Sequence, residues 1–144
     1  MGAFVADAAI KEMIEAGMAP KKATVVVLGL TFKENCPDTR NSKGVDIVNR
    51  LKEYDINPIV TDNWADAAVA KHEYGIDLVS WKDIPKADCV IVAVGHKEFR
   101  NMSMMELKKL FREDLADEEK VLIDVKSLYR MDELKASGMR FWRL

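Results

Sequence analysis

The 144-residue sequence is poor in the side chains that build metal sites and disulfides, with two cysteines and two histidines. Cys36 and Cys89 form no CxxC pair and stand at no metal-ligand spacing from His72 or His96. The sequence therefore predicts no metal site. Cys89 lies in an apolar run and is expected in the core. Cys36 is expected to be an ordinary loop residue, because no histidine adjoins it in sequence to act as a base.

The sequence also lacks an excess of positive charge and any long hydrophobic run. The formal net charge is −2, which disfavours general binding to a phosphate backbone. The longest apolar run, around residues 25–30, is far shorter than the ~20 residues that span a bilayer. No signal-peptide pattern is recognised either. We therefore expect a cytoplasmic protein that contacts neither nucleic acid nor membrane.

The composition and the hydrophobic pattern favour one compact α/β domain. Hydrophobic residues make up 49% and charged residues 32% of the chain, an ordinary balance for a globular protein. Buried apolar runs predict strands at residues 24–30, 57–62, 88–94, 121–125 and 140–142, with a very short one at 77–79. Helical spacing predicts helices at 4–17, 43–54, 64–73, 103–111 and 131–137. The alternation indicates βαβ units, and thus a Rossmann-like three-layer fold with a mostly parallel sheet.

A dinucleotide-binding fingerprint is missing from this Rossmann-like pattern. After the first predicted strand only Gly29 is present, and Phe32 and Lys33 occupy positions where a GxGxxG turn brings the backbone close to a pyrophosphate. Asp62 follows the second strand, where an acid can bind the ribose of NAD, but without the glycines that signal is weak. The residues therefore predict the fold without the NAD motif.

Basic residues follow several of the predicted strands, at the edge where open parallel sheets bind ligands. The segments concerned are 31–41, 95–99 and 126–130, and they carry Lys33, Arg40, His96, Lys97, Lys126 and Arg130. Lysine and arginine supply charge-assisted hydrogen bonds to phosphate or pyrophosphate. Strand-end loops are polar in most proteins, so an anionic ligand site and an ordinary solvated edge both remain open. His96 is expected to be a polar loop residue rather than a catalytic base.

Residues 27–42, which read VLGLTFKENCPDTRNS, are the most specific part of the sequence. They resemble the LGLxFKxxxxDxRxS segment of the UDP-glucose/GDP-mannose dehydrogenase family. Residues 1–6, 92–99 and 141–144 are similar to the branch that oxidises UDP-N-acetylhexosamines. The resemblance extends over essentially the whole chain.

This resemblance implies a part of a larger oxidoreductase of polysaccharide biosynthesis. The full enzyme is expected to oxidise the C6 alcohol of a UDP-sugar to a carboxylate in two NAD-dependent steps. An upstream N-terminal domain, missing here, would hold most of the NAD and the catalytic cysteine. The resemblance therefore implies no catalytic residue in this chain and no turnover by it alone.

The resemblance also implies a division of the chain. Residues 1–18 are expected to be the end of a long central helix that forms the core of a homodimer, with an apolar face that has no partner in this chain. Residues 19–144 are expected to be the C-terminal domain that binds the nucleotide sugar.

Four residues receive roles from the resemblance. Phe32 and Lys33 are expected to lie against the UDP-sugar, and Arg40 to reach toward NAD. Lys126 is expected near the UDP, where many relatives carry an arginine. Lysine keeps the charge but loses the planar fork that allows two parallel hydrogen bonds.

Two other functions remain as alternatives. The domain could serve chiefly for dimerisation or as a lid, with the upstream half binding the substrate unaided. A free-standing small-molecule sensor of flavodoxin-like architecture is supported by the fold class alone.

Overall fold

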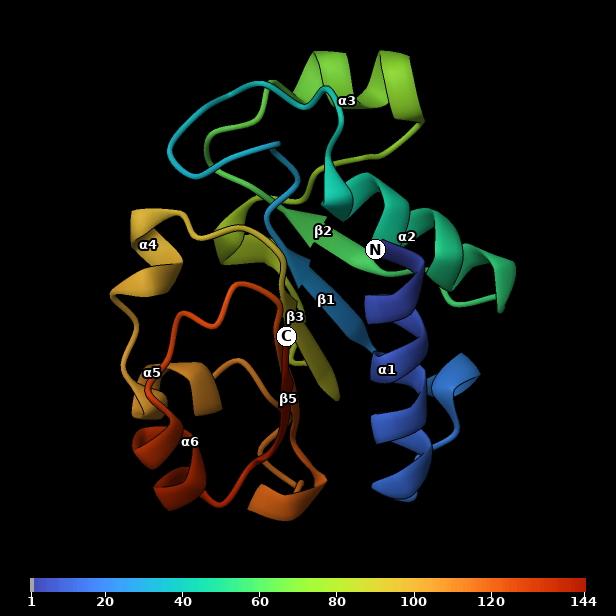
Figure 1. Cartoon of the computed structure of the whole chain (residues 1–144). Helices are drawn as coiled ribbons and strands as arrows, with labels where there is room; N and C mark the ends of the chain where they lie inside the picture. Colours follow the sequence, from blue (N-terminus) through green and yellow to red (C-terminus); the bar gives the residue numbers. More distant parts are fainter. Residues whose placement is uncertain (1) are drawn as a thin grey trace.

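A computed structural model describes residues 2–144, which form one parallel five-stranded sheet with helices on both faces (Figure 1). The strands are β1 (Val25–Leu28), β2 (Ile59–Thr61), β3 (Cys89–Val92), β4 (Val121–Asp124) and β5 (Arg140–Arg143). Their order across the sheet is β2-β1-β3-β4-β5, and every neighbouring pair is parallel. The predicted α/β fold with a mostly parallel sheet is confirmed.

The helices divide between the two faces of the sheet. They are α1 (Gly2–Glu15), α2 (Lys43–Glu53), α3 (Ala67–Tyr74), α4 (Lys97–Arg100), α5 (Met104–Lys108) and α6 (Met131–Ser137), with short 3-10 turns η1 (Pro20–Lys22), η2 (Trp81–Asp83) and η3 (Asp117–Glu119). In Figure 1, α1 and α2 lie on one side of the strands, and α4, α5 and α6 lie on the other.

Alternate residues of each central strand serve opposite cores, because successive side chains of a strand point to opposite faces. Val25 and Val27 belong to the core beneath α1 and α2. Val26 and Leu28 belong to the core that contains Phe99 and residues of α5 and α6. This two-sided burial is why the strands appear in the sequence as unbroken apolar runs.

Helix α1 has its partner within this chain, so the prediction of an unpartnered apolar face is wrong. Val5, Ala9 and Met13 are buried in the core that α1 shares with α2 and the sheet. The outward side of α1 exposes Phe4 and Ile14, each 58% accessible. The sequence periodicity identified an apolar helix but could not show which face the sheet covers.

Two predicted helices differ from the observed ones at one end each. Helix α3 begins at Ala67 rather than at residue 64, because the Asp66 side chain caps it by accepting from the backbone N–H groups of Ala68 and Val69. Helix α5 ends at Lys108, three residues before the predicted end. The very short strand expected at 77–79 is reduced to a single bridge between Val60 and Leu78.

Candidate functional site

The loops that follow β1, β2, β3 and β4 meet at one end of the sheet, which is the upper end in Figure 1. Because β1 and β3 are neighbours and β4 follows β3, the ends of β1 and β4 lie about 10 Å apart, at two strand spacings. Lys33 and Lys126 are therefore on the same edge, on loops separated by the end of β3.

Asp62, just after β2, joins two of these loops through its buried carboxylate. Its Oδ2 atom accepts hydrogen bonds from the N–H groups of Leu30 at 2.6 Å and Thr31 at 3.2 Å. Its Oδ1 atom accepts from Trp64 N at 2.7 Å and Ala65 N at 3.0 Å. The carboxylate thus fixes both the start of the loop after β1 and the turn that follows β2.

These hydrogen bonds decide the charge state of Asp62. Burial by itself would raise the pKa of the carboxyl, but hydrogen bonds from His96 and from the backbone of Leu30 and Trp64 outweigh burial, and the pKa is lowered. Asp62 is therefore a buried anion at neutral pH, surrounded by donors.

His96, which follows β3, extends this network to the middle of the loop after β1. Its Nδ1 atom accepts from the backbone N–H of Asn35 at 2.9 Å. Its Nε2 atom lies 2.9 Å from Asp62 Oδ2 and 3.1 Å from Thr31 Oγ1, and the Thr31 hydroxyl in turn donates to the carbonyl of Lys33 at 2.9 Å. An Nδ1 that accepts assigns the ring proton to Nε2, which then donates to Asp62.

The His96 ring is fully buried and packed between aromatic side chains. Its centroid lies 6.0 Å from that of Trp64 and 5.6 Å from that of Phe99. Trp64 is itself held by an N–H bond to Glu98 at 3.0 Å, and the Lys97 ammonium lies 5.6 Å from its ring centroid. His96 therefore has no exposed surface for a substrate to reach, and its contacts are those of a residue that holds loops together.

The four residues predicted to bind ligands are all exposed at this edge. Phe32 is 47% accessible although it is aromatic. Among residues 2–144, no carboxylate lies within ion-pair distance of Lys33 or Lys126. Arg40 differs, because it forms a two-pronged pair with Asp38, with Nε–Oδ1 at 3.0 Å and Nη2–Oδ2 at 2.9 Å.

A backbone hydrogen bond from Phe32 to Asp38 closes the loop that carries Phe32 and Lys33, and Asp38 in turn pairs with Arg40. The hydrogen bonds from Arg40 lower the pKa of Asp38 to about 2, so this carboxylate stays ionised. The backbone carbonyl of Asp38 accepts from Phe32 N at 2.7 Å. The structure thus brings Phe32, Lys33 and Arg40 together on one loop, whereas Lys126 approaches from the other side of β3.

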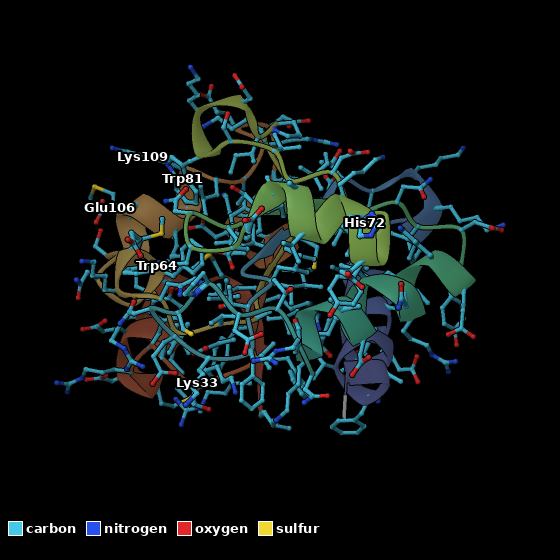
Figure 2. The ribbon with its side chains drawn as sticks, turned by 90° about the horizontal axis from the view of Figure 1, so that it is seen from above. Lys33, Trp64, His72, Trp81, Glu106 and Lys109 are labelled. Carbon is cyan, nitrogen blue, oxygen red and sulfur yellow. The ribbon has the colours of Figure 1, made fainter. Side chains whose placement is uncertain are left out.

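Two surface hollows of the domain do not enclose Lys33 or Lys126. One of about 340 Å³ is lined by Arg40, Pro37, Asp38, Thr39, Asp66 and Val69. Another of about 440 Å³ is lined in part by Trp81, Glu106 and Lys109, and Figure 2 shows these three side chains well apart from Lys33. Neither hollow includes Lys33 or Lys126. The exposed cations therefore form an open edge rather than an enclosed pocket.

The turn after β1 does not fit the pyrophosphate of a dinucleotide. The N–H groups of Leu30 and Thr31, which would face a phosphate in such a turn, bond Asp62 instead. Gly29, at φ +104°, packs so closely on Val94 that an added Cβ would lie 2.7 Å from Val94 Cβ. This glycine serves packing between strands, and the prediction that the NAD fingerprint is absent agrees with the geometry.

Asp124 at the end of β4 is a site residue that the sequence reasoning missed. Its buried carboxylate accepts from Leu128 N at 2.9 Å and Tyr129 N at 3.0 Å, which shapes the loop that carries Lys126. Burial raises the pKa of Asp124, because these bonds do not offset the loss of water. An aspartate at the end of an apolar run, as at Asp62, was the signal in the sequence.

Residues 2–144 contain no group of three His, Cys, Asp or Glu side chains that could form a metal site. None of the helices described is both long and apolar enough to cross a membrane.

Comparisons with known proteins identify relatives along the whole chain. Residues 26–131 match the UDP binding domain of the UDP-glucose/GDP-mannose dehydrogenase family. Protein CapL of Staphylococcus aureus is 42% identical over 100% of this chain and 32% of its own length. The UDP-N-acetyl-D-glucosamine 6-dehydrogenase of Pseudomonas aeruginosa is 44% identical over 94% of this chain and 31% of its own length.

Solved structures share the fold. That of UDP-D-ManNAc dehydrogenase from Pyrococcus horikoshii superposes with a TM-score of 0.76 at 23% identity, over 99% of this chain and 30% of that one. The chain therefore spans about a third of the length of these relatives.

Proposed function

The chain belongs to the UDP-glucose/GDP-mannose dehydrogenase family and matches its UDP binding domain, and from this premise we propose that it binds the UDP-sugar substrate of a 6-dehydrogenase. The proposed substrate is a UDP-N-acetylhexosamine, because a relative named for UDP-N-acetyl-D-glucosamine is 44% identical. The whole protein would be an NAD-dependent cytoplasmic enzyme that oxidises the sugar at C6.

The observation that carries this proposal is a pair of exposed cations at the carboxyl edge of the sheet, Lys33 and Lys126, which have no carboxylate partner among residues 2–144. Lys33, which follows the exposed Phe32 in sequence, and Lys126 stand on loops braced by Asp62 and Asp124. Two ammonium groups suit the two charges of a pyrophosphate, and an aromatic ring suits a base or sugar face. The proposed roles are thus Phe32, Lys33 and Lys126 for the UDP-sugar.

Arg40 is proposed to reach toward NAD from the same loop. The Arg40 side chain is 84% accessible even though it pairs with Asp38, so its guanidinium remains exposed to a ligand. The main binding of NAD and the nucleophilic step are assigned to the part of the relatives that this chain does not match.

Binding to the chain itself tests the proposal. UDP-N-acetylglucosamine and UDP would be titrated while amide shifts are followed by NMR, and shifts at Phe32, Lys33 and Lys126 are expected. Lys33→Ala should weaken binding about tenfold or more, because it removes a charge-assisted contact worth about 1.5–3 kcal/mol. Lys135→Ala, an exposed lysine on α6, is the matched control. Equal affinity of the Lys33 and Lys135 variants would refute the role of Lys33.

The second candidate function is dimerisation, and the exposed Phe4 and Ile14 of α1 favour it. We propose a homodimer in which α1 continues a longer central helix. Removal of residues 1–18 would also uncover the core beneath α1, so Ile14→Glu is the cleaner variant. If millimolar UDP-sugar causes no shifts and Ile14→Glu abolishes a dimer in light scattering, this second function is favoured.

A further inference from the structure

We propose that Asp62 and His96 are positioning residues for the UDP-sugar site, and that they hold residues 31–42 in place only while His96 keeps Nδ1 free of a proton. The inference rests on the proposed function, since it concerns the loop to which Phe32 and Lys33 are assigned. Neither side chain needs to touch the ligand, because both are buried.

The contacts place an anchor on each side of Phe32 and Lys33. On one side, Asp62 accepts from Leu30 N and Thr31 N. On the other side, Asn35 donates its N–H to His96 Nδ1 at 2.9 Å. These anchors reduce the number of conformations open to the two residues between them, which lowers the entropy lost when a ligand binds.

A second pair of bonds tightens the same segment. The Thr31 hydroxyl donates to the carbonyl of Lys33 at 2.9 Å, and the Asn35 side-chain oxygen accepts from Lys97 N at 3.0 Å. Asn35 itself adopts φ 56°, the left-handed region that asparagine tolerates better than most residues. The backbone conformation at Asn35 is thus held by the side chain of His96, which lies on the loop after the neighbouring strand β3.

Protonation of His96 would break this arrangement. A proton on Nδ1 converts the acceptor into a donor, which would then oppose the N–H of Asn35. The loop must move, since the buried ring is packed against Trp64 and Phe99.

The charged groups around the ring are Asp62, whose Oδ2 lies 2.9 Å from Nε2, and Glu98 and Lys97. Whatever the pH at which His96 protonates, a proton on Nδ1 removes the acceptor for Asn35. Affinity for the UDP-sugar should therefore fall as His96 takes up its second proton.

Imidazole NMR of the unmodified chain tests the geometry. The chain has two histidines, and His72 is exposed on α3, well away from Lys33 in Figure 2. Nitrogen shifts should show His96 as a single tautomer with its proton on Nε2, and His72 as an ordinary solvated ring. As pH falls, the amide shifts of residues 32–35 should change together with the His96 ring.

Binding measured over the same pH range tests the consequence. Affinity for UDP-N-acetylglucosamine, whose pyrophosphate has no proton to gain near neutrality, should fall at the pH where NMR shows His96 to protonate. His96→Gln keeps a donor toward Asp62 but has no acceptor at the Nδ1 position. It should bind about tenfold more weakly at neutral pH, the effect of one lost hydrogen bond, and should show no step with pH. His72→Gln should retain both the affinity and the step.

Each result bears on one of the two proposals. A proton on Nδ1 at neutral pH, loop shifts that ignore the protonation of His96, or a His96→Gln variant with unchanged affinity and an unchanged step would overturn the positioning role. Absence of binding by the unmodified chain would instead count against the proposed function. The ligand-free shifts of residues 32–35 would still decide whether His96 holds the loop.

Discussion

Two buried aspartates, each at the carboxyl end of a strand, differ in how well their environments solvate them. Asp62 accepts four backbone N–H groups and a ring nitrogen of His96. Asp124 accepts hydrogen bonds from Leu128 N and Tyr129 N. The pKa of Asp62 is consequently lowered in spite of burial, while burial raises the pKa of Asp124. The same residue type in equivalent positions therefore contributes to stability with opposite dependence on pH.

Asparagine substitutions should separate the two sites. Asp62→Asn replaces one acceptor oxygen with an NH2 group, which would face the backbone N–H groups that this oxygen now accepts. We therefore expect a loss of about 3 kcal/mol in the free energy of unfolding. Asp124→Asn removes a poorly solvated charge as well as an acceptor, so a smaller loss of about 1 kcal/mol is expected. Urea unfolding at neutral pH measures both, and equal losses would contradict the account.

The pH dependence of these two losses should have opposite signs. The lowered pKa of Asp62 gives stability that is present above about pH 4, the ordinary carboxyl range, and is lost as pH falls through the lowered value. The raised pKa of Asp124 means that its ionisation destabilises the folded state. This destabilisation develops as pH rises through the ordinary carboxyl range and is absent in acid. The loss caused by Asp62→Asn should shrink toward pH 3, and that caused by Asp124→Asn should grow. Unfolding curves at two pH values check the trend.

At the scale of the element, α1 is a helix with one face in the core and one face exposed. Met13 is fully buried beneath it, whereas the next residue, Ile14, is 58% accessible. Because successive residues of a helix point about 100° apart, neighbours in sequence can belong to the core and to the surface. The helix is therefore part of this domain's core, even though its outer face remains available to a partner.

Truncation of these two neighbours should give unequal effects. Met13→Ala should cost about 2–5 kcal/mol, as for other large-to-small core changes, and Ile14→Ala should change stability by about 0.5 kcal/mol or less. The free energy of unfolding from urea curves at low protein concentration measures the pair without a contribution from association. Similar losses for both variants would show that the exposed face is also buried in solution.

At the scale of the whole molecule, we propose that the chain supplies the ligand edge, while the parts needed for oxidation belong to the portion of the relatives that it does not match. The turn after β1 uses its N–H groups on Asp62 rather than on a phosphate. Cys89 is fully buried in β3, and burial raises the pKa of its thiol far above the usual range, so it is an inert core residue as the sequence predicted. Binding of the sugar and its oxidation are therefore expected to be separable.

The chain alone should bind UDP-N-acetylglucosamine but not oxidise it. With that sugar and NAD present, absorbance of NADH should not increase, because positioning without a nucleophile and a bound hydride acceptor supplies no chemistry. A full-length relative is the positive control. Turnover by the chain would contradict the assignment of oxidation to the unmatched part of the protein.

Local pattern was enough to predict the five strands and helices α1, α2, α3, α5 and α6, but not the four-residue α4. Strand residues buried on both faces appear as apolar runs, and a helix such as α2 appears in the spacing of Val45, Val48 and Leu51. The start of α2 is likewise fixed locally, by the Ser42 side chain, which accepts from Val45 N at 3.2 Å. Such features depend on residues three or four apart, so the sequence carries them directly.

The sequence by itself determined the α/β fold, the family to which residues 26–131 belong and the segments that end at the carboxyl edge. Tertiary structure decided the rest, because the bonds concerned join residues far apart in sequence. Thr31 and His96 are separated by 65 positions, and Asp62 and His96 by 34. Such contacts depend on the order of strands across the sheet, which the run of elements along the chain does not specify. For that reason the sequence indicated a polar loop residue at His96, but only the structure shows that it is the buried link between three strand ends.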